Sequence, residues 1–448
     1  MPDISLMHLL FFAYLLLFSL SLLATRMDIL HPAVIGTGIL TISGFFGVEG
    51  ARWWGYHLTL EGFWVLFLGL AAFVAASLWV THEVPLVTPS RKADELPAIH
   101  EISWRLSIFF SILMLVFAYI NAQDMYELSL QFGNTEGYRR MISIVRLAVE
   151  QDEAVFSRWM SYRTVVAQML AYIYLYLLLS NTIFCGWKWR YLAAVPPILC
   201  YLPFLVLSTG RMTMFYFVIY GFTVASILYL KKHDYSKKAR RNILLCAVCA
   251  GATFALLFYL MGLITGKTSF SLVGRSYFHI FAHYAGTSLP AFGTVVTYPA
   301  LENGYIGSHT LAPIYRVLIR LGMDFPFVKS FMPFTDFDHV ETNVYTVFWR
   351  YFLDYGFIGM SLMMVILAEG YTLAYLWIRR SRLHPYAIMA YGMVVYPVFW
   401  FPMDERFFME VFNTTTIYDL ILLYLLCKLL LQHAKKTPIS PPSTISLH

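Results

Sequence analysis

An all-α polytopic membrane protein, with about eleven to twelve transmembrane helices and a large external loop, is the fold class that the sequence predicts. Composition is the first reason: of 448 residues, 59% are hydrophobic, 18% aromatic and only 13% charged, more apolar surface than a soluble domain can bury. The second reason is the length of the uninterrupted apolar runs. Because unpaired backbone amides are costly in hydrocarbon, runs of about 20 residues favour membrane-spanning helices.

Eleven apolar runs have about the length that a bilayer requires. The first run lacks a basic segment before it and a small-residue cleavage site after it, so we expect a retained helix instead of a signal peptide. The predicted spans are 5–24, 33–48, 61–81, 106–122, 164–185, 191–209, 212–230, 242–263, 357–378, 385–402 and 414–431.

The basic loop 231–241, KKHDYSKKARR, sets the expected orientation because Lys and Arg are retained on the cytoplasmic side. Alternation from this loop places the other short basic loops inside and the first residues outside. It divides the chain into an N-terminal membrane region (1–263, with an outer loop at 123–163), a large external cap (264–356), a C-terminal membrane region (357–431) and a cytoplasmic tail (432–448).

Two chemical classes are disfavoured by the sequence. The formal charge of +6 is explained by loop topology, so we expect no nucleic-acid partner. Cys246 and Cys249 form a C-x-x-C pattern inside a predicted span, but their apolar neighbours offer no polar support for a metal or redox site. We therefore expect buried thiols there and no metal cofactor.

Arginines are frequent on the predicted outer side, where topology alone predicts few basic residues. Lysine is nearly absent there, and only the guanidinium grips phosphate or pyrophosphate with two parallel hydrogen bonds. Arg211 is notable because it lies in LSTGRMTMF, at a junction of two predicted helices, where a charge at membrane depth is costly unless it binds something. The alternative for these arginines, including Arg163, is contact with lipid headgroups or pairing with nearby carboxylates.

Arg275 begins the segment GRSYFHIFAHY, in which His279 and His283 are four residues apart and share a helix face. No acidic residue or third ligand accompanies them, so we expect interfacial or substrate contacts instead of a metal site. Tyr277 in this segment is a candidate for stacking on a sugar, and a place in the interfacial aromatic belt is the alternative.

The segment 341–360, ETNVYTVFWRYFLDYGFIGM, leads directly into a predicted span. As a helix it would align Asn343, Thr346, Arg350 and Asp354 along one stripe. Asn343 could then orient a sugar hydroxyl, Arg350 could bind phosphate, and Asp354 could pair with Arg350. An interfacial helix with an internal Arg–Asp pair is the alternative.

TGRM at a helix junction, the large outer loop and TNVYTVFWRYFLDYGFIGM before a span resemble the bacterial oligosaccharide repeat-unit polymerases, the Wzy-type O-antigen and capsule polymerases. The resemblance implies a GT-C-like, metal-independent glycosyltransferase in the bacterial inner membrane with its active face in the periplasm. It would use undecaprenyl-pyrophosphate-linked glycans as donor and acceptor, need no cofactor, and work beside a chain-length regulator and a flippase.

Carried over by motif, the resemblance implies that Arg211 and Arg275 hold the donor pyrophosphate and that 343–350 forms the acceptor side. An activated pyrophosphate leaves mainly with charge neutralisation and alignment, so a general base is optional, and His279, His309, His339 and Asp336 stay open. The remaining candidates for substrate binding are Arg163, Tyr277, Tyr345, Thr346, Tyr351 and Asp354. The alternatives are an O-antigen ligase, a lipid-linked sugar flippase or transporter, and an assembly subunit without activity.

Overall fold

The computed structural model describes residues 3–55, 57–84, 99–100, 102–150, 153–208, 212–265, 277–296, 305–326, 332, 334–337, 340–380, 384–432 and 436–437. Within these residues the chain is almost entirely helical, with two short two-stranded sheets. By length and composition, nine of the described helical segments can cross a membrane, and Pro385–Phe399 is a shorter apolar helix. The predicted all-α, multi-pass membrane protein is confirmed at this level.

The eleven predicted spans each coincide with a helical part of the described chain. The span predicted at 191–209 is broken into three short pieces, because prolines in the first turns of the second and third pieces remove backbone donors. The span predicted at 385–402 is likewise two helices in succession. These pieces are η2 (Trp189–Ala194), α7 (Val195–Cys200) and α8 (Leu202–Leu207), then α15 (Pro385–Val394) and α16 (Tyr396–Phe399).

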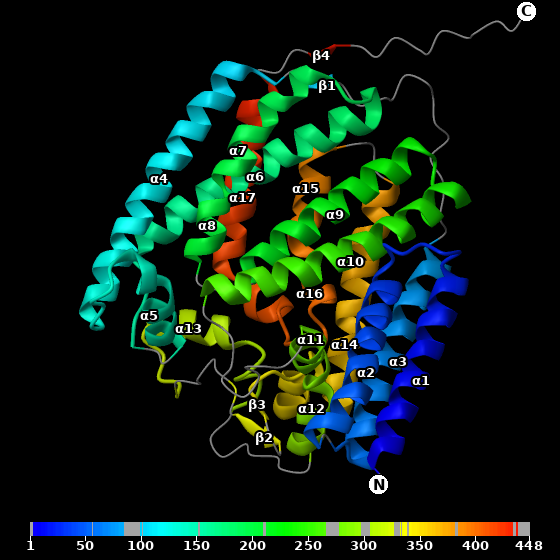
Figure 1. Cartoon of the computed structure of the whole chain (residues 1–448). Helices are drawn as coiled ribbons and strands as arrows, with labels where there is room; N and C mark the ends of the chain where they lie inside the picture. Colours follow the sequence, from blue (N-terminus) through cyan, green and yellow to red (C-terminus); the bar gives the residue numbers. More distant parts are fainter. Residues whose placement is uncertain are drawn as a thin grey trace, which may run out of the picture.

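Two apolar cores hold the helices together (Figure 1). The first is formed by α1 (Asp3–Ala24), α2 (Pro32–Trp54), α3 (Leu60–Glu83) and α14 (Phe348–Arg380). The second is formed mainly by α4 (Trp104–Gln131), α6 (Arg158–Cys185), α9 (Met212–Lys232), α15 and α17 (Thr414–Gln432). The long helix α10 (Lys237–Thr265) packs beside α9, and α5 (Tyr138–Glu150) packs against α4.

The short elements of the predicted external cap gather at one end of the bundle, at the bottom of Figure 1. Glycines allow one of them, α11, to lie directly on α2: a Cβ on Gly286 would stand 2.5 Å from the backbone nitrogen of Gly47. Such small residues permit close helix approach in membranes. The cap elements are α11 (Tyr277–Gly286), α12 (Ser288–Val296), α13 (Ala312–Arg320) and the hairpin of β2 (Thr335–Phe337) and β3 (Val340–Thr342).

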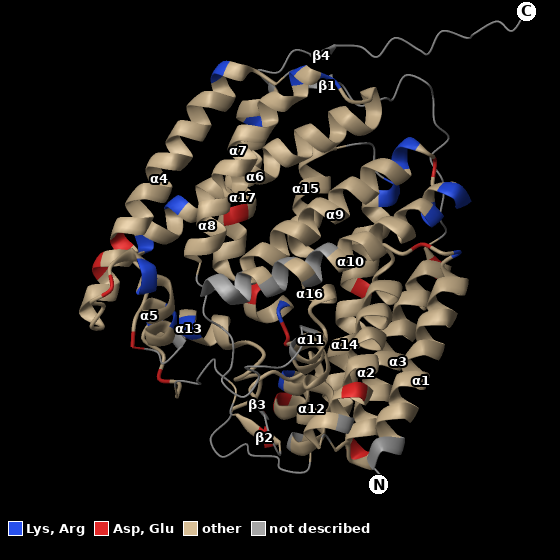
Figure 2. Cartoon of the chain, in the orientation of Figure 1, with Lys and Arg blue, Asp and Glu red and all other residues tan. Residues whose placement is uncertain are grey.

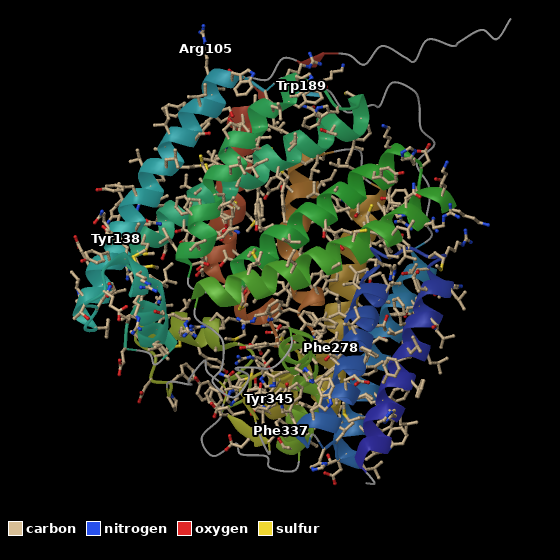
Figure 3. All side chains as sticks on the ribbon, in the orientation of Figure 1. Arg105, Tyr138, Trp189, Phe278, Phe337 and Tyr345 are labelled. Carbon is tan, nitrogen blue, oxygen red and sulfur yellow. The ribbon has the colours of Figure 1, made fainter. Side chains whose placement is uncertain are left out.

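The opposite end of the bundle carries the basic connections. There β1 (Ile99–His100) pairs with β4 (Lys436–Thr437), and Lys and Arg residues lie in the last turns of α9 and α14 and in the first turns of α10 (Figure 2). Trp189 and Arg105 lie at this end, whereas Phe337 and Tyr345 lie at the cap end (Figure 3). The two faces that the charge pattern predicts are therefore separated in space.

α14 has a break that separates the cap from the membrane-spanning part. Gly356 has φ 64° and ψ −168°, a backbone conformation that side chains with a Cβ rarely adopt. The break agrees with the predicted start of a span at 357. The predicted helix from 341 is wrong, however, because 340–342 form β3 and the helix starts at Phe348. Asn343 and Thr346 therefore precede the helix, and no stripe of four polar residues forms.

Candidate functional site

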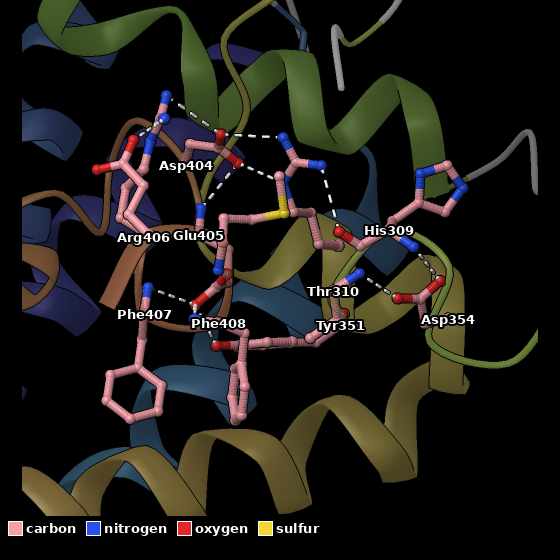
Figure 4. Close-up of polar contacts among 12 residues, drawn as sticks. His309, Thr310, Tyr351, Asp354, Asp404, Glu405, Arg406, Phe407 and Phe408 are labelled. Carbon is pink, nitrogen blue, oxygen red and sulfur yellow. Dashed lines mark hydrogen bonds and ion pairs between the residues drawn. The ribbon is translucent and has the colours of Figure 1, made fainter. Parts of the chain in front are cut away.

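A buried ion pair joins the start of α14 to the connection between α16 and α17. The Arg350 guanidinium donates from Nε to Asp404 Oδ1 at 2.9 Å and from Nη2 to Asp404 Oδ2 at 3.1 Å (Figure 4). The two side chains are only 4% and 10% exposed. Because both acceptor oxygens are used, the pair fixes the orientation of the two side chains as well as their distance.

The ion pair continues into a larger polar cluster through Arg406. Its Nη2 lies 3.4 Å from Asp404 Oδ2, and its Nη1 donates to Glu410 Oε1. The other Glu410 oxygen accepts hydrogen bonds from the hydroxyls of Tyr216 and Tyr396, each at 2.7 Å. Glu410 is therefore held by three partners, and these bonds tie α9 and α16 to the turn before α17.

Glu405 organises the backbone of this connection. Its carboxyl accepts hydrogen bonds from the amides of Phe407 and Phe408 at 2.7 and 2.9 Å and from the Tyr351 hydroxyl at 2.9 Å. It thereby caps the π-helical turn η4 (Phe407–Val411), and such turns occur frequently at functional sites. Burial raises the pKa of the Glu405 carboxyl from 4.5 to about 7, although the Phe408 amide and Tyr351 oppose the shift.

Asp354 holds the cap segment before α13. Its two carboxylate oxygens accept from the backbone amides of His309, at 3.1 Å, and Thr310, at 2.6 Å (Figure 4). Burial lowers the pKa of His309, an effect that Asp354 opposes and Arg350 reinforces. Arg350 Nη1 also donates to the His309 carbonyl at 3.4 Å. The predicted Arg350–Asp354 pair is wrong, because the Arg350 guanidinium pairs with Asp404 and the Asp354 carboxylate accepts hydrogen bonds from backbone amides.

Two arginines on α13 provide positive charge beside this cluster. Arg316 and Arg320 are one helical turn apart, and neither pairs with a carboxylate within the described residues. Burial, and then the Arg320 and Arg350 charges, lower the pKa of Arg316. The helix α13 packs against the turn η4 of the cluster. Arg316 is half-buried and Arg320 is exposed, so both remain available to an anion.

Several predicted site residues lie outside the described part of the chain. These are Arg211, Arg275 and His339, together with the side chain of Tyr277. Their predicted roles stay predictions. Thr213, two residues after Arg211, lines a cavity described below, and Glu410 of the polar cluster lines the same cavity.

Other predicted residues have partners away from the cluster. His279 stacks on Trp53 of α2 with ring centroids 3.8 Å apart, and His283 contacts Trp54 at 5.7 Å. Burial lowers the pKa of His283 to about 4. Arg163 donates to Asn121 Oδ1 at 2.7 Å and pairs with Asp124, which joins α6 to α4. For Arg163, the structure thus shows pairing with a carboxylate, which was the alternative to phosphate binding.

The candidates just before and within α14 are largely enclosed. Tyr345 and Thr346 are fully buried, and Tyr345 shares a hydrogen bond of 2.7 Å with Thr335 and stacks on Trp349. Tyr351 is also fully buried against Glu405. Asn343 is half-buried between β3 and the helix. Tyr345, Thr346 and Tyr351 are therefore inaccessible to a ligand in this structure, and only Asn343 is partly exposed.

Sequence reasoning missed the segment 401–410, FPMDERFFME, which supplies most of the cluster. Its signal is a run of three charged residues, Asp404 to Arg406, followed by Glu410, within the short connection between two apolar helices. Neither the helical periodicity nor the family motifs cover this connection. The pairing with Arg350 also spans 54 residues, beyond the reach of a local pattern.

Two cavities flank the cluster. One is an apolar groove of about 600 Å³, lined along α2, α9 and α10, with Tyr284, Trp400 and Met403 also in its lining. Met403 directly precedes Asp404, so the groove borders the polar cluster. The other is a polar cavity of about 310 Å³ between α6, α9, α16 and α17. Phe215 lines the groove and the next residue, Tyr216, lines the cavity, so α9 forms part of the wall between them.

Comparisons with protein-family models, with curated proteins and with solved structures found no match to this chain. In the described ranges, no three His, Cys, Asp or Glu side chains are grouped as a metal site requires.

Proposed function

We propose that the protein is a glycosyltransferase that polymerises oligosaccharide repeat units carried on undecaprenyl pyrophosphate, as the resemblance to the Wzy-type polymerases suggests. The observation that carries the proposal is the apolar groove whose lining residue Met403 directly precedes Asp404, the partner of Arg350. A polyprenyl chain needs apolar surface at membrane depth, and its pyrophosphate needs cations where the membrane ends. The groove supplies the apolar surface, and the Arg350 cluster with the arginines of α13 supplies the cations.

The chemistry follows from the charges in this region. A sugar on pyrophosphate is already activated, so the protein must neutralise the departing diphosphate and align an acceptor hydroxyl. Arg316 and Arg320 supply guanidinium groups that no described carboxylate occupies. Arg350 and Arg406 are held by Asp404 and Glu410, so their role is to fix the cluster. Arg211 and Arg275 complete the donor side in this proposal.

The architecture proposed is GT-C-like, in the bacterial inner membrane, with the cap in the periplasm. A chain-length regulator and a flippase belong to the same proposal as partners. The orientation is supported by the separation between the basic connections and the cap (Figure 2).

The proposal is tested by elongation in vitro. Purified protein in nanodiscs is mixed with purified lipid-linked repeat units, without added metal and with a chelator. We expect a ladder of longer lipid-linked glycans. No elongation by properly folded protein, or elongation that a chelator abolishes, contradicts the proposal. In a deletion strain, single-repeat surface glycan supports a polymerase, whereas long lipid-linked chains without surface glycan indicate a ligase.

A matched pair of glycine variants tests the groove itself. Gly251 lines the groove, and a Cβ there would meet no atom within 4 Å. Gly370 on α14 is equally open but lies elsewhere. We expect Gly251→Trp to fill the groove and abolish elongation while Gly370→Trp keeps it. Equal activity of the two variants would show that the lipid chain does not occupy the groove.

A further inference from the structure

The polar cavity beside the cluster is lined by residues of α6, α9, α15, α16, η4 and α17. Its volume of about 310 Å³ is at the lower end of the range for small-molecule pockets, about 300–1,000 Å³. Most of the lining side chains carry an amide, a hydroxyl or a carboxylate. The lining residues are Gln168, Tyr172, Thr213, Tyr216, Met393, Tyr396, Glu410, Val411, Asn413, Thr415, Thr416 and Asp419.

Part of this polar lining is held in place by internal contacts. The Gln168 amide donates to the Tyr172 hydroxyl at 2.9 Å, and the Tyr172 ring stacks on Tyr220 with centroids 4.0 Å apart. Glu410 is fixed by Arg406 and by two tyrosine hydroxyls. The walls of the cavity are therefore ordered before any ligand enters, which lowers the entropy lost on binding.

Asp419 differs from the other acidic residue of the cavity. It lies in the second turn of α17 and is half-buried, yet among the described residues it accepts no hydrogen bond and forms no ion pair. A carboxylate without a partner inside an apolar helix is costly and usually marks a functional position. Its negative charge also opposes the entry of phosphate, so the cavity suits a neutral ligand that donates hydrogen bonds.

The position of the cavity relates it to the apolar groove. Tyr396 lines the cavity, and Trp400, one turn later, lines the groove. The ring of Tyr216 contacts both, with centroids 4.0 Å from Tyr396 and 6.3 Å from Trp400. A ligand in the cavity would therefore lie across a single layer of aromatic side chains from a lipid in the groove.

We propose that this cavity binds a sugar ring, with Asp419 accepting hydrogen bonds from the sugar hydroxyls. That the ring belongs to a lipid-linked repeat unit rests on the proposed function. The binding of a hydroxyl-rich ligand follows from the cavity alone: it combines a fixed amide, several hydroxyls and one free carboxylate at a size that admits one ring.

The test measures binding without turnover. The probe is the single-repeat oligosaccharide released by mild acid from the lipid-linked precursor of the strain that encodes the protein. Its binding to wild-type protein in nanodiscs is followed by saturation-transfer-difference NMR. The variants are Asp419→Asn and Asp419→Leu, with Glu369→Gln as the control. Glu369 is a carboxylate in another apolar helix, α14, that does not line the cavity.

We expect saturable binding to the wild type and to Glu369→Gln, and at least about 10-fold weaker binding to both Asp419 variants, because a hydrogen bond to a charged group is lost. No saturable binding to the wild type, or equal affinity for Asp419→Asn, overturns the proposal. The proposal is also overturned if sodium stabilises the wild type but not the Asp419 variants and displaces the sugar, because that result indicates a cation site. If the wild type binds the sugar but never elongates it, the proposed polymerase fails and the sugar site remains.

Discussion

The ion pair between Arg350 and Asp404 offers the sharpest test of the cluster. Removing the guanidinium in Arg350→Ala leaves a carboxylate that is only 10% exposed without its main partner. Breaking a buried pair in this way costs about 3–5 kcal/mol in the free energy of unfolding. Arg140 and Glu136 provide a matched control, because their N–O distance is also 2.9 Å while their side chains are 63% and 45% exposed. Arg140→Ala should cost under about 1 kcal/mol.

The free energy of unfolding is measured by steric trapping in bicelles for the wild type and both alanine variants. It is also measured for the single variants Arg350→Met and Asp404→Leu and for the double variant that combines them. We expect the double variant to recover much of the lost stability, because replacing a buried pair by apolar residues removes the desolvation cost. If Arg350→Ala costs no more than Arg140→Ala, the pair is not buried as the structure has it. Additive effects of the single substitutions at 350 and 404 would also refute the reasoning.

Three further predictions concern charge at the site. Because the pKa of Glu405 is raised from 4.5 to about 7, the folded state holds a proton that the unfolded state has released between these pH values, so the free energy of unfolding should fall as pH rises from 4.5 to 7. The slope of this pH dependence should be smaller in Glu405→Gln, and an unchanged slope would show that Glu405 is not its source. Replacing Arg316 and Arg320 together by alanine should slow elongation roughly 10- to 100-fold with normal expression, and an unchanged rate would remove α13 from the donor site. Alanine at Arg211 or Arg275 should abolish elongation without loss of membrane insertion, with only partial rescue by lysine, and normal glycan lengths on gels would contradict this.

Local patterns were sufficient to predict where the helices lie. Each predicted span depends on a continuous apolar run, and the break at Gly356 coincides with the predicted start of a span at 357. The periodic reading failed at Asn343 and Thr346. A hydrophobic and polar pattern with helical spacing was present there, but the residues just before Asn343 form β3, which pairs with β2 in a hairpin. The local hairpin therefore displaced the predicted first turns of the helix, which begins only at Phe348.

The partners within the site could not be predicted in the same way. Asp354 was the natural partner for Arg350 because it is one turn away, yet it serves two backbone amides of the cap. Asp404 reaches Arg350 from a connection 54 residues later in the chain, and only the folded arrangement shows this. Arg163 illustrates the same limit, since its partner Asp124 lies on a different helix.

The central claim is that the cap and the Arg350 cluster face the outside of the cell, where lipid-linked sugars await polymerisation. Ile306 in the cap and Trp189 at the opposite end are both 78% exposed, so cysteines at these positions should be equally reactive. In a variant with its five native cysteines replaced by serine, a membrane-impermeant maleimide is added to intact spheroplasts. We predict labelling of Ile306→Cys in intact cells and of Trp189→Cys only after the membrane is opened, and the reverse pattern would contradict the account.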